Sequence, residues 1–311
     1  MASRTLCQYI GVATVGYLLT KSFSTLFLFV RPSKLGRYRR QGTRTWALVT
    51  GASDGIGRGF AEELCARGFN VILHGRNAAK LAGVQESLKK EYANTEIRTL
   101  VADVVSFDMS TCTKLIEPLV DLHITVLINN VGGVTPVTGV DREFYPFGSF
   151  SGSQIDGLID LNHRFTTHIT NAMLPSLRRN SPGLIMNISS AAEMGFPWLT
   201  IYSGTKGYIH AFTRALNIEM KAEKTGVEVL SITVGAVQAA NNKSGSGLFC
   251  PPARVMAAAA LDRVGCGVAS VTAYWPHALQ KWFMDSLPES WLDALASGVL
   301  RGRAEETKKN M

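Results

Sequence analysis

Cysteine is scarce in this chain of 311 residues, and its distribution excludes two classes of protein. The cysteines are odd in number and lie far apart: Cys7, Cys65, Cys112, Cys250 and Cys266. They form no Cys-x-x-Cys pair, and no histidine cluster has the spacing of metal ligands. A disulfide-stapled fold and a structural zinc site are therefore excluded, and we expect no metal site and a reducing, cytosol-facing environment.

Acidic residues are absent from the first 44 positions, which hold eight Lys and Arg residues. The whole chain has 32 Lys and Arg against 24 Asp and Glu, so this segment accounts for the entire net charge of +8. The rest of the chain is neutral, which argues against nucleic-acid binding by the folded core. A hydrophobic content of 46% against 18% charged residues also excludes a disordered protein.

Residues 6–30 form an apolar stretch interrupted by only one charge, Lys21, and about 20 such residues suffice to cross a bilayer. The basic flank at 31–40 places the following domain in the cytosol by the positive-inside rule. We therefore expect a membrane anchor here. Two alternatives stay open, a cleaved signal peptide and a segment that embeds without crossing, because a charge such as Lys21 is costly at mid-membrane.

Short apolar runs alternate with helical segments along the rest of the chain. Strands are predicted at 46–50, 69–73, 97–101, 124–128, 184–188 and 227–233, with helices between them. This alternation predicts an α/β fold with a doubly wound parallel sheet of the Rossmann type. The predicted domains are a hydrophobic anchor at 1–30, a basic juxtamembrane linker at 31–45, the sheet domain at 46–265 and an amphipathic helical extension at 266–311.

A glycine-rich turn, Thr50-Gly51-Ala-Ser-Asp-Gly55-Ile-Gly57, follows the first predicted strand and opens a helix. Glycines let the backbone approach a diphosphate closely, and a helix N-terminus supplies unpaired N–H groups. The context favours a phosphate-binding turn over a turn without a ligand.

Tyr202 and Lys206 are four residues apart on a predicted helix, so their side chains share one face. A lysine ammonium beside a phenol favours the phenolate, and such a tyrosine suits a general acid. Taken alone, the same spacing also fits an ordinary exposed pair.

Three ordered motifs together resemble the short-chain dehydrogenase/reductase family: the glycine turn, Asn129-Asn130-Val131-Gly132, and Tyr202-x-x-x-Lys206. The resemblance covers roughly residues 46–265. Within the family the chain is similar to the microsomal branch of very-long-chain 3-oxoacyl-CoA reductases and 17β-hydroxysteroid dehydrogenases. The shared features are the apolar N-terminus, Asn-Asn-Val-Gly, Leu199-Thr-Ile-Tyr202 and a lysine-rich tail.

The resemblance implies the catalytic roles. Tyr202 protonates the carbonyl oxygen, Lys206 also binds the cofactor ribose, and Asn162 holds a proton-relay water. A serine after the strand at 184–188 binds the carbonyl. Ser189 has the family's separation of thirteen from the tyrosine, whereas Ser190 matches the second serine of the Ile-Ser-Ser pattern and is slightly favoured.

The end of the second predicted strand bears on cofactor choice. An acidic residue there binds the ribose of NAD, whereas this chain has His74-Gly75-Arg76-Asn77, in which Arg76 suits a phosphate. We therefore expect NADP(H). The resemblance implies cofactor contacts from Gly51, Ser53, Asp54, Gly55, Ile56, Gly57, Arg76, Asp103, Asn130, Tyr202, Lys206 and Val237. The family's Pro-Gly after the sixth strand is Val234-Gly235 here, a departure that leaves the packing of this segment unpredicted.

Several segments bear on the substrate. Residues 239–249 read as a mobile loop over the site, and Phe196-Pro-Trp198-Leu199 reads as the lining of an apolar pocket. An apolar stripe recurs at helical spacing in Trp275, Leu279, Trp282, Phe283 and Leu287. A core helix, a dimer interface and a membrane-surface helix all fit that stripe.

These features favour a membrane-anchored, NADPH-dependent reductase of a lipid-like ketone, most simply a 3-oxoacyl-CoA in very-long-chain fatty-acid elongation. One alternative is a 17β-hydroxysteroid or specialised-metabolite ketoreductase, and a second is a non-catalytic NADP-binding membrane scaffold. Lys308 and Lys309 resemble a dilysine retrieval signal, which indicates the endoplasmic reticulum membrane with the catalytic domain facing the cytosol. Expected partners are an acyl-CoA or sterol ketone, the membrane, fatty-acid elongation enzymes and further copies of this chain, but no nucleic acid.

Overall fold

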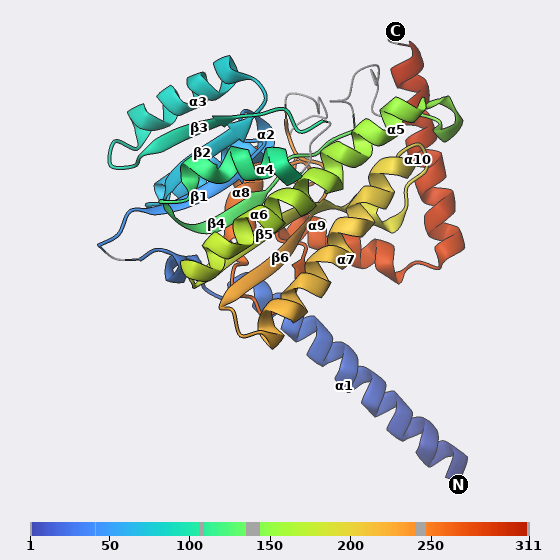
Figure 1. Ribbon diagram of the computed structural model, residues 1–311. Coiled ribbons are helices and arrows are strands. Elements are labelled where there is room, and N and C mark those ends of the chain that lie inside the picture. The colour runs from blue at the N-terminus through green and yellow to red at the C-terminus, as the bar shows by residue number, and fades with distance from the viewer. Residues whose placement is uncertain (1, 41, 106–108, 135–143, 240–246, 310–311) are drawn as a thin grey trace.

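The computed structural model describes residues 2–309 except 41, 106–108, 135–143 and 240–246 (Figure 1). Its centre is a parallel sheet of seven strands in the order β3-β2-β1-β4-β5-β6-β7. The strands are β1 Thr45–Thr50, β2 Asn70–Gly75, β3 Ile97–Val101, β4 His123–Asn129, β5 Gly183–Ser190, β6 Val227–Val234 and β7 Ser270–Val271. The predicted α/β fold with a doubly wound sheet is confirmed.

Helices cover both faces of this sheet, as Figure 1 shows. One hydrophobic core lies beneath α2, α3 and α8, and the second lies beneath α4, α6 and α7. The helices are α1 Ala2–Val30, α2 Gly55–Ala66, α3 Ala78–Glu91, α4 Met109–Ile116, α5 Gly152–Ile159, α6 Phe165–Arg179, α7 Thr200–Ala222, α8 Ala253–Asp262, α9 Trp275–Ser286 and α10 Glu289–Lys309. Every residue of β1 and β2 is buried, which explains why these strands read as continuous apolar runs.

Polar side chains lock the strand ends at the centre of the sheet. Thr50 Oγ1 donates to Ile128 O at 3.2 Å and accepts from Asn130 N at 2.9 Å, so it joins the ends of β1 and β4. Asn129 Nδ2 donates to Asn187 Oδ1 at 2.8 Å and joins β4 to β5. The strand order reverses between β1 and β4, and doubly wound folds bind ligands at such a reversal. The hydrogen bonds of Thr50 and Asn129 therefore hold the strand ends together at the expected ligand site.

The sheet extends past residue 265. Strand β7 pairs with β6 through Ser231 and Ile232, and it lies inside the range 266–311 that was predicted as a helical extension. Two residues are too few to show a strand pattern in the sequence.

Helix α1 projects away from the body (Figure 1) and carries exposed apolar side chains. The side chains of Tyr9, Val12, Tyr17 and Phe23 are each at least 65% exposed. In the described part of the chain, no helix combines the length and the hydropathy of a membrane-crossing segment. The membrane anchor expected at 1–30 stays a prediction.

The basic linker is folded onto the domain rather than free. Ser33 Oγ donates to Leu261 O at 2.6 Å, and Lys34 N donates to Val264 O at 3.0 Å. Tyr38 is buried, and Glu228 accepts from its hydroxyl at 2.6 Å. These contacts fix the point from which α1 leaves the body.

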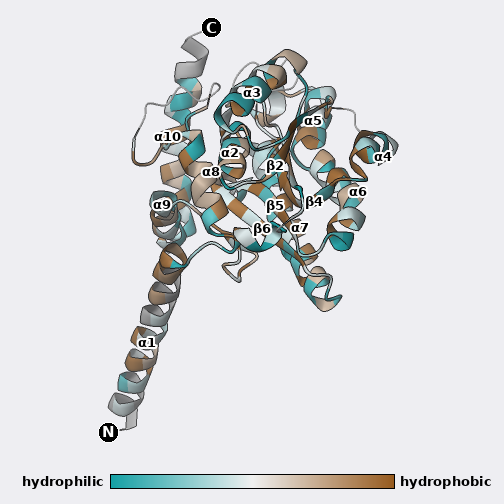
Figure 2. Ribbon diagram, turned by 90° about the vertical axis from the view of Figure 1, so that its left-hand side faces the viewer, coloured by the Kyte–Doolittle hydropathy of each residue, from teal (hydrophilic) through white to brown (hydrophobic). Residues whose placement is uncertain are grey.

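Helices α9 and α10 lie along the same edge of the molecule as α1 (Figure 2). The predicted apolar stripe falls on α9, where Trp275, Leu279, Trp282 and Phe283 are all at least half exposed and Leu287 is half-buried. The interpretation of this stripe as part of the core is therefore wrong. The stripe forms an exposed apolar face, which fits the other two interpretations, a dimer interface and a membrane-surface helix.

Candidate active site

A cleft of about 560 Å³ opens at the carboxyl ends of the strands. Its wall contains most of the residues that the sequence singled out. They are Gly51, Ser53, Asp54, Gly55, Ile56, Arg76, Asp103, Asn130, Ser189, Ser190, Tyr202, Lys206 and Val237. Gly57 and Asn162 lie just behind this wall, and their contacts shape it.

The glycine turn brings the N-terminus of α2 to the cleft. Gly51 has a φ of +66°, a conformation that favours glycine. A Cβ on Gly57 would lie 2.1 Å from Gly51 O, so the backbones touch where a side chain would stand. Asp54 begins the helix by accepting from Gly55 N at 2.7 Å, and Asn130 Nδ2 donates to Thr50 O at 3.1 Å. The turn thus has the tight geometry that a diphosphate-binding loop needs.

The adjoining end of β2 carries a cation and no carboxylate. Arg76 lines the cleft directly after β2, with Asp103 after β3. His74 also lines the cleft, is fully buried and stacks on Phe165 at 5.1 Å between ring centroids. Burial lowers the pKa of His74 to about 4, so this imidazole is neutral at physiological pH. The sequence did not single out His74 for the cleft.

Lys206 is buried on α7 behind Tyr202. Its ammonium donates to Ile188 O at 2.8 Å and lies 5.5 Å from the centroid of the Tyr202 ring. Burial lowers the pKa of Lys206 to about 8, and the charge of Glu193 partly opposes this shift. The interpretation of Tyr202 and Lys206 as an exposed surface pair is wrong, because Lys206 is only 4% exposed.

The two candidate serines end β5 and have different environments. Ser189 is 2% exposed, and its hydroxyl donates to Glu193 Oε2 at 2.8 Å. Ser190 is half-buried and accepts from Ala192 N at 3.2 Å. A hydroxyl that accepts from the fold keeps its own proton to donate to a ligand. The geometry therefore favours Ser190 for contact with a carbonyl oxygen.

Asn162 lies in a π-helical turn, Asp160–Arg164, between α5 and α6. Its amide accepts from Gly133 N at 2.9 Å and donates to Gly133 O at 2.8 Å. A Cβ on Gly132 would lie 2.8 Å from Asn162 Oδ1 and 3.2 Å from Lys206 Nζ. Asn162 and Lys206 therefore enclose Gly132, and the Asn-Asn-Val-Gly motif ends in glycine because no side chain fits between them.

The other end of the cleft is apolar. Phe196 and Leu199 line it, as predicted, together with Phe144. Leu300 and Arg303 of α10 complete the wall, and the sequence gave no sign of either, because their approach depends on how α10 folds back. Residues 240–246 of the predicted mobile loop lie outside the described residues.

The sequence matches the short chain dehydrogenase family over residues 45–246. That match spans more than half of the chain, and the site has the family's three motifs in one cleft. The chain belongs to the short-chain dehydrogenase family. Members are oxidoreductases, so the cleft is the active site of one.

Curated relatives of this short-chain dehydrogenase extend over nearly its whole length. A very-long-chain 3-oxoacyl-CoA reductase of Danio rerio is 33% identical over 308 residues, or 97% of this chain and 96% of the relative. A protein of Arabidopsis thaliana described as very-long-chain 3-oxoacyl-CoA reductase-like is 33% identical over 290 residues, or 88% and 86%. The resemblance to very-long-chain 3-oxoacyl-CoA reductases is thus confirmed.

Solved structures of short-chain dehydrogenases show the same fold. A Sphingobium yanoikuyae enzyme in complex with NADPH aligns with a TM-score of 0.61 and 24% identity, over 79% of this chain and 96% of its own. A structure from work on the stereoselectivity of a 7beta-hydroxysteroid dehydrogenase aligns with a TM-score of 0.66 and 20% identity, over 80% of this chain and 95% of its own.

Proposed function

We propose that this protein is a membrane-associated, NADPH-dependent ketoreductase that converts 3-oxoacyl-CoA to 3-hydroxyacyl-CoA in very-long-chain fatty-acid elongation. The observation that carries the proposal is the buried Lys206 behind Tyr202 in a cleft that has Arg76 after β2 and a mostly apolar wall with Arg303 at its other end. Curated relatives named very-long-chain 3-oxoacyl-CoA reductase support the substrate.

The residues of the cleft fit NADPH. The glycine turn and the N-terminus of α2 would hold the diphosphate. Gly57 is needed in this turn because a side chain there would collide with the backbone of Gly51. Arg76 holds the 2′-phosphate, and the end of β2 has no carboxylate to repel it. Asp103 and Asn130, which line the cleft, would contact the adenosine, and Val237 would contact the nicotinamide. The bound cofactor supplies the hydride.

Side chains of the protein stabilise the negative charge that develops on the ketone oxygen during reduction. Ser190 donates a hydrogen bond to the ketone oxygen, and Tyr202 gives that oxygen its proton. The Lys206 ammonium stabilises the phenolate that remains, which requires Lys206 to be protonated. Asn162 stays the predicted relay residue, and its bonds to Gly133 also hold the turn beside Lys206.

The apolar end of the cleft suits a long acyl chain. Phe144, Phe196, Leu199 and Leu300 offer apolar surface, and Arg303 adds a cation to the wall, which suits an anionic CoA ester better than a neutral sterol.

Membrane association is the second part of the proposal. Helices α1, α9 and α10 lie along one edge of the molecule (Figure 2). Each carries exposed apolar side chains, among them Trp282 of α9 and Trp291 of α10 at 63% and 67% exposure. An apolar edge of this extent suits insertion into a bilayer surface, and aromatic residues favour that interface. The basic linker and the pair Lys308–Lys309 support the cytosolic face of the endoplasmic reticulum.

Turnover of two ketones separates this function from the main alternative. NADPH oxidation is measured with a long-chain 3-oxoacyl-CoA and with a 17-ketosteroid in parallel, and Tyr202→Phe is the control. We expect fast turnover of the acyl-CoA alone, lost in the variant. Preference for the steroid would assign the protein to the hydroxysteroid dehydrogenases, and NADPH binding without any turnover would favour a scaffold.

A further inference from the structure

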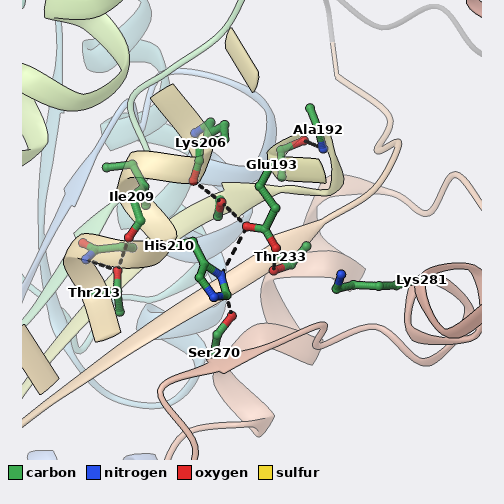
Figure 3. A network of polar contacts seen from close by, with 12 residues as sticks. Ala192, Glu193, Lys206, Ile209, His210, Thr213, Thr233, Ser270 and Lys281 are labelled. Carbon is green, nitrogen blue, oxygen red and sulfur yellow. Dashed lines mark hydrogen bonds and ion pairs between the residues drawn. The ribbon is translucent and has the colours of Figure 1, made fainter. Parts of the chain in front are cut away.

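Glu193 is a nearly buried carboxylate directly behind the catalytic residues. It belongs to the short helix Ala191–Met194, between β5 and α7, and its side chain is 9% exposed. Its carboxylate accepts from Ser189 Oγ at 2.8 Å and from Thr233 Oγ1 at 3.3 Å, and it lies 3.4 Å from His210 Nδ1 (Figure 3). Glu193 thus connects β5, β6 and α7 beside the active site.

The contacts of Glu193 continue to both catalytic elements. Ser189 Oγ also lies 3.2 Å from Lys206 O, so one hydroxyl touches the carboxylate and the backbone of the catalytic lysine. The next residue along β5 is Ser190, which also lines the cleft and whose hydroxyl accepts from Ala192 N. Because Ser189 donates its hydroxyl proton to Glu193, Ser190 is the serine of this pair whose proton remains for a ligand.

Lys206 is buried and carries a charge that needs compensation. Its ammonium donates to a backbone carbonyl, Ile188 O, and within the described residues no carboxylate comes within 4 Å of it. The charge of Glu193 is the acidic influence on the pKa of Lys206, and it opposes the effect of burial. A carboxylate at this depth acts strongly because little water screens it.

Other charged groups also face Glu193 and Lys206. His210 of α7 contacts the Glu193 carboxylate, and Ser270 lies 3.4 Å from the same ring nitrogen. Lys281 of α9 points toward the network from the other side in Figure 3 and pairs with Asp285 at 3.1 Å. Tyr202 lies beside Lys206 on α7. His210, Lys281 and Tyr202 thus share the surroundings of Glu193 and Lys206.

We propose that Glu193 is a positioning residue of the reductase, a buried counter-charge that keeps Lys206 protonated while it holds the Ser189 hydroxyl in a hydrogen bond. The inference rests on the proposed function only for the roles of Lys206 and Ser190 in ketone reduction. Removal of the carboxylate charge lowers the affinity of Lys206 for its proton. Since the working form of Lys206 is the ammonium, activity is then lost at a lower pH.

The pKa of Lys206 is the direct readout, and it requires neither substrate nor cofactor. It is followed by 13C NMR of the full chain with labelled lysine, and the signal is assigned by its loss in Lys206→Arg. Glu193→Gln keeps the shape and the acceptor for Ser189, and we expect it to lower the pKa by about half a unit or more. Thr233→Val removes one contact but no charge, and it leaves the pKa in place.

An unchanged pKa in Glu193→Gln overturns the inference. If this variant does not fold, Glu193→Asp carries the test. It withdraws the charge by one methylene, so it must lower the pKa of Lys206 to a smaller extent, and an unchanged value again overturns the inference.

The pH profile of NADPH oxidation is the second readout. We expect the alkaline loss of activity to move down in Glu193→Gln by the same interval as the pKa, with the rate at pH 6.5 nearly retained. A rate lost equally at every pH would contradict this role. A lowered pKa in a protein that reduces no 3-oxoacyl-CoA would refute the proposed function and leave the counter-charge intact.

Discussion

Ser189 and Ser190 provide a paired test of the active-site geometry, because alanine substitutions at these two neighbouring serines should affect activity and stability differently. Ser190→Ala removes a donor from the developing oxyanion. We expect kcat to fall roughly 10²- to 10³-fold, equivalent to about 3–4 kcal/mol, while stability and NADPH affinity stay near the wild-type values.

Ser189→Ala removes a hydrogen bond of 2.8 Å to a buried carboxylate. A hydrogen bond to a charged group contributes about 1.5–3 kcal/mol, so we expect this loss in the free energy of unfolding. The fall in kcat should be much smaller than for Ser190→Ala. Urea unfolding and steady-state NADPH oxidation on both variants make the comparison. A Ser189→Ala variant that is stable but catalytically dead, beside an active Ser190→Ala, would refute the assignment.

Three further predictions concern the cofactor, acid stability and the membrane. Arg76→Ala should raise the Kd for NADPH roughly ten- to a hundredfold and leave the Kd for NADH unchanged in fluorescence titrations, because only NADPH carries the phosphate; equal losses for both would refute its role. The pKa of His74 is about 4 in the fold, below the unfolded value of 6.5, so the unfolded chain binds the proton first and stability falls as pH drops from about 6.5 to about 4. Urea midpoints at pH 7 and pH 5 should show that fall in the wild type and a smaller one in His74→Phe, and parallel slopes would contradict it. Trp282→Glu should weaken flotation with anionic liposomes, whereas Ile218→Glu, also exposed but on α7, should not; equal binding by both variants would count against the apolar edge.

Much of the fold follows from local sequence pattern. Strands β1 to β6 lie within two residues of the predicted ranges, because buried parallel strands are continuous apolar runs between glycine-rich turns. The motif residues come together because parallel strands end at one edge of the sheet. Strand β7 escapes detection, since its two residues show no periodicity.

The rest depends on contacts between distant segments. Leu300 and Arg303 reach the cleft only because α10 folds back over it, and no periodicity encodes that approach. Glu193 lies in the short helix Ala191–Met194, and in so short a segment the sequence pattern does not show whether a carboxylate is exposed or buried. The stripe containing Trp282 shows the converse limit, since spacing reveals an apolar face but not what covers it.

Transfer of a labelled hydride tests the central claim most directly. The full-length protein is given a long-chain 3-oxoacyl-CoA with NADPH that carries deuterium in place of the transferred hydride, and the acyl product is analysed by mass spectrometry. The proposed function predicts a 3-hydroxyacyl-CoA with one deuterium at carbon 3, formed by the wild type and not by Tyr202→Phe. If the protein is folded and binds NADPH but leaves the 3-oxoacyl-CoA unchanged, the proposed function is contradicted.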